Sequence, residues 1–178
     1  MSRGPWGSRK RQRLSNERWR LSCKAELLEE QHEKPNVQGG RIMALFPSQE
    51  WMSELGRLLK ESKEYQQAAK DWEGGLALII EPDAVCKQEY YAYLEPHHGT
   101  IKEACMMSKP DEKPAAYVLS GPYSAWKDVV MGKQDAVSSL MKGKLRLKQG
   151  KMASLMKNVK ASQITMKTMQ FIKTEFVG

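Results

Sequence analysis

The sequence offers few side chains that could carry out chemistry, and two adjacent histidines are the first to consider. His97 and His98 lie in segment 96–99, where a proline and a glycine are typical of a turn. The side chains of adjacent residues are expected to diverge, and the sequence places no further metal ligands nearby. We expect Glu95, beside them, to be a solvated turn residue. We therefore predict no metal site here, because zinc in proteins usually has four ligands.

The three cysteines also give little indication of catalysis. Cys23, Cys86 and Cys105 are odd in number and widely spaced, with no CxxC pair, which argues against a disulfide framework and favours a reducing cytosol. We expect Cys105 to be a buried thiol rather than a nucleophile. The chain has no GxSxG elbow, no P-loop and no GxGxxG motif. We predict that the protein is not an enzyme, binds no metal and needs no cofactor.

The formal net charge of +8 belongs mainly to the N-terminal part of the chain. Residues 1–42 hold ten Lys/Arg and five Glu, whereas residues 43–178 hold nineteen Lys/Arg and sixteen Asp/Glu. The body is close to balanced, so we do not expect a nucleic-acid partner for it. Its longest apolar run, residues 76–80, is far shorter than the roughly 20 residues of a membrane span. A cytoplasmic protein is expected.

Residues 1–42 are predicted to be a basic, disordered extension, because no apolar periodicity attaches them to a core. Trp6 and Trp19 interleave the arginines and could stack on bases, so a nucleic-acid-binding arm is the alternative. Gly39 and Gly40 shortly precede Met43, and purine-rich codons could encode them. We hypothesise that the native start is Met43, which N-terminal mass spectrometry of the natural protein would test.

In residues 43–178, helical hydrophobic stripes and short strand-like runs follow one another. A helical stripe that includes Trp51 and Leu55 begins at Ser48, a plausible N-cap, and ends near Asp71. Short runs rich in β-forming residues then predict strands at residues 76–80, 87–95, 100–107 and 115–120. Helices are expected at 123–131 and 136–142, a half-buried edge strand at 144–148, and a helical region after Gly150. Strands in direct succession pair as antiparallel hairpins, so the fold class is α+β, with helices on one face of a sheet.

This order resembles the sterol carrier protein (type two) family over nearly all of the chain after Met43. The segments that carry the resemblance are residues 76–80, 121–126, 130–133, 140–151 and 174–176. The resemblance implies a five-stranded, mostly antiparallel sheet covered on one face by helices, with an apolar tunnel between them. It also implies non-catalytic binding and carriage of a fatty acid, acyl-CoA, sterol-like molecule or phospholipid. An accessory domain that presents an acyl substrate to a partner enzyme is a further alternative.

Residues that could line such a tunnel share strand or helix faces. They are Leu76, Leu78, Ile80, Tyr117, Leu119, Trp126, Val130, Met141, Met152, Met156, Met166 and Met169. Methionine is flexible, so a methionine-rich wall can follow an irregular ligand, although plain core packing explains the same pattern. We expect either lipid that co-purifies with the protein or a C-terminal helix that collapses into the tunnel.

Basic residues could form a rim for an anionic headgroup or membrane surface. They are Lys133, Lys142, Lys144, Arg146 and Lys148. The alternative is a solvated charged edge. The expected partners are thus a lipid or acyl-chain ligand and transient contact with a membrane, and a homodimer stays open.

Overall fold

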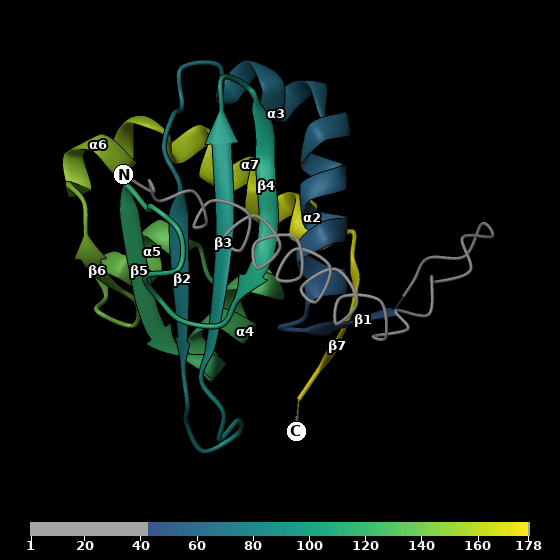
Figure 1. Cartoon of the computed structure of the whole chain (residues 1–178), viewed down its shortest axis with the longest axis vertical. Helices are drawn as coiled ribbons and strands as arrows, with labels where there is room; N and C mark the ends of the chain where they lie inside the picture. Colours follow the sequence, from purple (N-terminus) through teal and green to yellow (C-terminus); the bar gives the residue numbers. More distant parts are fainter. Residues whose placement is uncertain (1–42, 178) are drawn as a thin grey trace, which may run out of the picture. The chain divides into compact units, whose positions relative to one another are not determined.

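The computed structural model describes residues 43–177, so the predictions for residues 1–42 lie outside the described residues. Figure 1 shows one sheet with helices on one of its faces. The strands of this sheet are β2 (Leu76–Glu81), β3 (Tyr90–His97), β4 (Thr100–Met107), β5 (Tyr117–Pro122) and β6 (Arg146–Gln149). The helices are α2 (Gln49–Glu61), α3 (Lys63–Ala68), α4 (Tyr123–Val130), α5 (Ala136–Met141), α6 (Met152–Lys157) and α7 (Val159–Met169). The predicted α+β class, with a five-stranded and mostly antiparallel sheet, is confirmed.

The strand order of the large sheet is β4-β3-β2-β5-β6. The central strand β2 pairs antiparallel with β3 and parallel with β5, and β6 forms an edge antiparallel to β5. The central place suits β2, because its sequence LALIIE is apolar along nearly its whole length. A strand covered on both faces needs such a continuous apolar run.

The prediction that successive strands pair as hairpins is wrong for β4 and β5. These strands lie apart, because segment 108–116 crosses the sheet on the face opposite the helices (Figure 1). Neighbouring strands are about 4.8 Å apart, so nine residues are long enough to pass over β3 and β2. The phenol of Tyr93 holds this segment by donating to the carbonyl oxygen of Pro114 at 2.9 Å.

The single helix predicted from Ser48 to about Asp71 is two helices. Ser48 is the N-cap of α2, and its Oγ accepts from the backbone N–H of Trp51 at 3.2 Å. Ser62 ends α2 in an extended conformation and caps α3, where its Oγ accepts from the N–H of Tyr65 at 3.2 Å. Serine often competes with the helix in this way, so the break at Ser62 has a local cause.

A second, two-stranded sheet was not predicted. Strand β1 (Met43–Phe46) pairs in parallel with β7 (Lys173–Phe176), which joins the two ends of the described chain. The ring of Phe46 contacts Trp51 and Phe176, with ring centroids 4.9 and 6.2 Å apart. The indole N–H of Trp51 donates to Thr174 Oγ1 at 2.9 Å. Each strand has four residues, which is too short for a reliable period-2 signal.

No helix within residues 43–177 combines the length and the apolar character needed to cross a bilayer.

Candidate functional site

A small apolar cavity lies between the large sheet and the helices that cover it. Its volume is about 80 Å³. The residues that line it are Trp72, Leu76, Leu78, Leu94, Leu119, Trp126, Val129, Ala136, Val137, Leu140, Leu155, Ser162, Thr165, Met166 and Met169.

The sheet provides an aliphatic wall. Leu76 and Leu78 are two residues apart on β2, so their side chains share one face. Across the ladders, Leu78 is paired with Leu119 of β5, and Leu76 with Leu94 of β3. Four leucines therefore come together from three adjacent strands.

The helices provide the opposite wall. Val137 and Leu140 of α5 are three residues apart, as are Met166 and Met169 of α7, and this spacing places each pair on one helix face. Leu155 of α6 completes this wall, and its side chain is buried. We call this helical wall the roof of the cavity. It is built from short helices of the C-terminal half of the chain.

The polar atoms at the cavity wall are mostly satisfied within the protein. Thr165 Oγ1 donates to the carbonyl oxygen of Ala161 at 2.9 Å, and the indole N–H of Trp126 donates to that of Ile79 at 3.2 Å. Trp72 is the exception, because its buried Nε1 has no hydrogen-bond partner among the described residues. An unpaired buried donor is unfavourable, so a ligand with an acceptor atom could stabilise it.

Half of the residues predicted to line a ligand site do line this cavity. They are Leu76, Leu78, Leu119, Trp126, Met166 and Met169. Ile80, Tyr117 and Val130 are buried elsewhere in the core, whereas Met141, Met152 and Met156 lie at the surface. Whether any of them contacts a ligand stays a prediction.

An elongated tunnel is not present in the part of the chain that the structure describes. Instead, the apolar cavity between the sheet and the helices has a volume of about 80 Å³. This volume is below the roughly 150 Å³ of an engineered protein cavity that accommodates benzene. The structure is therefore closed against a long acyl chain.

Sequence reasoning missed several lining residues because it favoured methionines for their flexibility. Val129 follows Trp126 by three residues and Val137 precedes Leu140 by three, so helical spacing could have identified both valines. Trp72 lies between α3 and β2, and no periodic pattern indicates that it faces the cavity.

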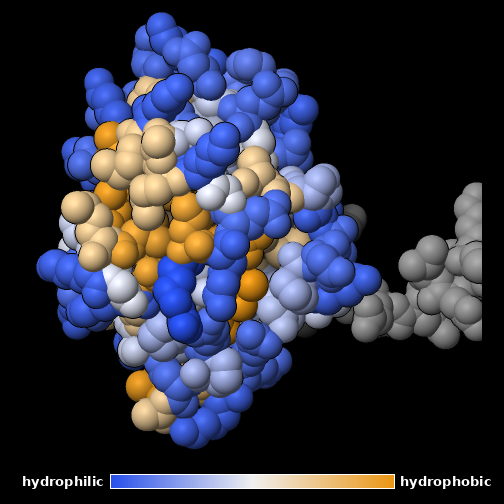
Figure 2. Space-filling view, turned by 90° about the vertical axis from the view of Figure 1, so that its left-hand side faces the viewer, coloured by the Kyte–Doolittle hydropathy of each residue, from blue (hydrophilic) through white to orange (hydrophobic). Residues whose placement is uncertain are grey.

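The five basic residues predicted as a rim are all exposed and none lines the cavity. The guanidinium of Arg146 pairs with Glu81 at 2.7 Å. The face formed by α5, α6 and β6, which Figure 2 views directly, gathers apolar side chains among hydrophilic ones. Met141 is 80% exposed there, and Met152 and Met156 are 39% and 40% exposed.

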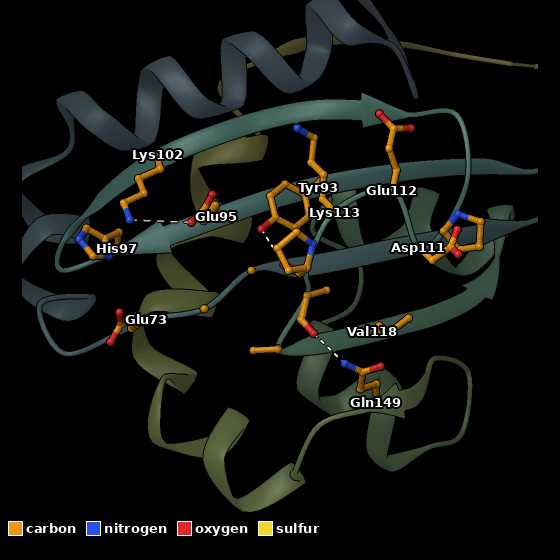
Figure 3. Close-up of a pocket in the computed structure, with 16 residues that line it drawn as sticks. Glu73, Tyr93, Glu95, His97, Lys102, Asp111, Glu112, Lys113, Val118 and Gln149 are labelled. Carbon is orange, nitrogen blue, oxygen red and sulfur yellow. Dashed lines mark hydrogen bonds and ion pairs between the residues drawn. The ribbon is translucent and has the colours of Figure 1, made fainter.

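A larger, polar groove of about 820 Å³ lies on the other face of the sheet, beneath segment 108–116 (Figure 3). Lys113 Nζ is 2.7 Å from Glu103 Oε1, and this contact lowers the pKa of the Glu103 carboxyl. Lys102 and Glu95 pair more loosely at 3.9 Å. A polar groove with such ion pairs is not suited to bind an apolar molecule.

The prediction that the side chains of His97 and His98 diverge is wrong. Their ring centroids are 4.5 Å apart, and the carboxylate of Glu73 joins them. The physical reason is the backbone of His98, whose φ of 46° turns its side chain back toward its neighbour.

Comparison with protein families and with solved structures gives consistent matches. A model of a family described as the SCP-2 sterol transfer family matches residues 55–163. A crystal structure of sterol carrier protein 2 is 32% identical, with a TM-score of 0.62, over 69% of this chain and 95% of that protein. A solution structure from Thermus thermophilus, of a conserved hypothetical protein described as a candidate sterol carrier protein, is 31% identical. Its TM-score is 0.66, over 78% of this chain and 96% of that one. The comparison with curated proteins returns no match.

Proposed function

Because the chain belongs to the SCP-2 sterol transfer family, we propose that it binds an apolar lipid reversibly and carries it without chemical change. The observation that carries this proposal is the cavity between sheet and helices, whose wall consists almost entirely of leucine, valine, alanine, methionine and tryptophan side chains. Such a wall excludes water and offers little for polar recognition, so it favours ligands that gain free energy by burial.

Uptake of a ligand requires the roof to open. Burial contributes about 0.8 kcal/mol per methylene, so a sixteen-carbon chain gains roughly 12 kcal/mol before entropic costs. Helices α5 and α6 have six residues each, and helices this short depend on packing for their stability. We place the opening at these two helices, with α7 supplying Met166 and Met169 as adaptable contacts.

The surface of the same two helices is suited to a membrane. Exposed Met141, Met152 and Met156 can enter the headgroup region, while neighbouring Lys142 and Lys157 can contact anionic lipids. Figure 2 shows this mixed face. Transfer at this surface would let the roof open where the lipid is available.

The test of ligand binding is direct. The purified full-length protein should yield lipid on organic extraction and mass spectrometry, or should bind a fluorescent fatty acid after delipidation. Ala136→Leu adds bulk at the cavity wall and should weaken binding at least about tenfold, whereas Ala84→Leu makes the same change at an exposed position of the loop between β2 and β3. The proposal fails if no lipid is extracted and no fatty acid binds, or if both variants bind equally.

Membrane contact is tested separately with vesicles that contain phosphatidylserine. Lys142→Glu together with Lys157→Glu should reduce co-sedimentation, and added salt should weaken it in the unmodified protein. Lys63→Glu, on α3, is the control and should have little effect. Binding that is equal for all these proteins would contradict a role of this face.

We also propose that the protein works in a reducing compartment such as the cytosol. Within the described residues, Cys86 is buried and Cys105 half-buried, and both are free thiols. Thiol labelling of protein from its natural host checks this, since oxidised cysteines would contradict it.

A further inference from the structure

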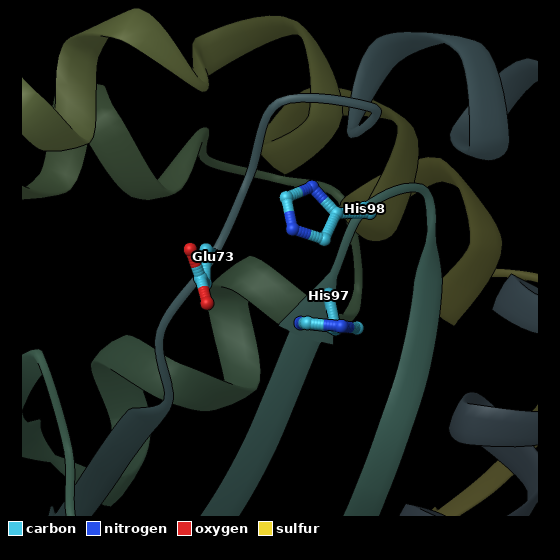
Figure 4. A group of neighbouring side chains, drawn as sticks. All are labelled: Glu73, His97 and His98. Atoms are coloured by element: carbon cyan, nitrogen blue, oxygen red, sulfur yellow. The ribbon is translucent and has the colours of Figure 1, made fainter.

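The geometry points to a binding site for one zinc ion, or a similar divalent transition metal, at Glu73, His97 and His98. One ligand atom from each residue lies within 4.8 Å of the other two. Figure 4 shows the two imidazoles and the carboxylate together at the turn between β3 and β4. This site lies outside the lipid cavity and stands independently of lipid binding.

The backbone fixes the position of both histidines. His97 pairs with Thr100, so only His98 and Gly99 connect the strands, with φ angles of 46° and 84°. Positive φ at both central residues defines a tight hairpin turn. The turn therefore has a defined backbone geometry, which sets where the two imidazoles leave the chain.

Backbone hydrogen bonds hold this turn against the segment after α3. The N–H of His98 donates to the carbonyl oxygen of Trp72 at 2.9 Å, and that of Gly99 to Ala69 at 2.8 Å. Glu73 forms an antiparallel bridge with His97. The carboxylate and the two imidazoles thus come from two segments that are already joined by backbone hydrogen bonds.

The ring of His98 is oriented as a metal ligand. Its Nδ1 lies 3.2 Å from the carbonyl oxygen of Lys70, which can accept a hydrogen bond from it. With Nδ1–H donating to this oxygen, the lone pair is on Nε2. Protein ligands of zinc are commonly held by a backbone carbonyl in this way, which fixes both the tautomer and the ring direction.

The donor set determines the class of ion. Imidazole nitrogen suits zinc, copper and nickel, whereas calcium and magnesium prefer oxygen ligands. With bonds of about 2.1 Å, a tetrahedral ion separates its ligand atoms by about 3.4 Å. Ligand atoms that already lie within 4.8 Å of one another need only small side-chain movements to reach this spacing. Glu73 is exposed and His97 half-buried. Water would complete the coordination shell.

The ion would connect the β3–β4 turn to the segment that carries Trp72, a residue of the cavity wall. His97 and Glu73 also border one end of the polar groove, where Glu95 and Lys102 pair with each other (Figure 3). Because Glu95 is already paired with Lys102, Glu73 is the carboxylate that would bind the ion.

The experiment is a zinc titration of the full-length protein, stripped with a chelator and kept reduced, against a fluorescent zinc indicator. His98→Asn suits the test because asparagine tolerates positive φ, and His97→Gln suits a strand. Each should weaken zinc binding at least about tenfold, and the double variant should abolish it. His32→Ala, outside the described residues, is the matched control and should bind as the unmodified protein does.

Two further measurements complete the test. Thermal unfolding without metal should show that the variants remain folded, and zinc should shift the amide NMR signals of residues 72–74 and 97–99. The inference is overturned if zinc does not bind, or if the double variant binds as tightly as the unmodified protein, which would place the ion elsewhere. It is equally overturned if the perturbed signals lie elsewhere.

Discussion

Trp126 joins helix α4 to the central strand of the sheet, because its indole N–H donates to the carbonyl oxygen of Ile79 at 3.2 Å while its ring forms part of the cavity wall. The same side chain therefore stabilises the domain and shapes the candidate lipid site. These two roles can be separated by experiment.

Replacing Trp126 with phenylalanine should lower the free energy of unfolding by about 1–2 kcal/mol, because it removes a partly buried hydrogen bond and some packing. It should also change the affinity for a fluorescent fatty acid. Trp51→Phe is the matched control, since it removes the hydrogen bond to Thr174 in a part of the core away from the cavity. Urea unfolding should show a loss for both variants, and ligand titration a change only for Trp126→Phe.

Replacing Trp72 with phenylalanine should have a different signature. The substitution removes a buried N–H that has no partner among residues 43–177, so the stability should change by no more than about 1 kcal/mol. If this N–H serves the polar end of a ligand, the variant should lose affinity for a fatty acid but not for an alkane of equal length. Equal losses for both probes would show that Trp72 contributes only its ring.

The close contact of α2 with β4 depends on the absence of a side chain at Gly56. A Cβ at Gly56 would lie 2.8 Å from the Cβ of Ala104. Gly56→Ala should therefore destabilise the fold by about 1–3 kcal/mol through overpacking, although alanine favours a helix by about 1 kcal/mol. Adding Ala104→Gly to this variant should restore part of the stability, and a urea double-mutant cycle measures the coupling. An increase in stability for Gly56→Ala alone would contradict the close approach.

Because of Asp83, the free energy of unfolding should depend on pH in the acidic range. Burial raises the pKa of its carboxyl, but the backbone N–H groups of Ser124, Cys86 and Val85 donate to it and together lower the pKa to about 2. Because the pKa in the folded state is below the ordinary 3.8, this stabilisation is complete above about pH 4 and is lost as the pH falls toward 2.

The variant Asp83→Asn tests this dependence. It should be less stable at pH 7 by about 1–2 kcal/mol, which is comparable to the loss of a helix N-cap. The reason is that the carboxylate of Asp83 accepts from the N–H of Ser124 in the first turn of α4. The difference from the unmodified protein should shrink between pH 4 and pH 2 in urea unfolding. Glu54 and Glu103 also have lowered pKa values, so only the difference between the two proteins isolates Asp83. A difference that does not vary with pH would refute the assignment.

Local patterns predicted most of the architecture. The apolar run at residues 76–80 predicted strand β2, Ser48 was expected to cap α2, and helices were expected where α4 and α5 lie. These features depend on a few neighbouring residues, which a sequence displays directly.

Features that depend on distant contacts were not predictable. The four-residue pairing of β1 with β7 and the parallel pairing of β5 with β2 join segments far apart in the chain. Likewise, the convergence of His97 and His98 follows from a turn geometry that sequence spacing does not reveal. The degree of closure of the cavity depends on how the C-terminal helices pack, which no single stripe encodes.

The parallel pairing of β1 with β7 also bears on how the domain would respond to mechanical force. Strand β1 begins at Met43 and β7 ends at Phe176, so pulling these residues apart draws the two strands along their length in opposite directions. In this geometry the hydrogen bonds between the strands are sheared together, whereas a hairpin pulled at its ends opens one bond at a time. A short pair of strands can therefore act as a mechanical clamp for the helices and the sheet between them.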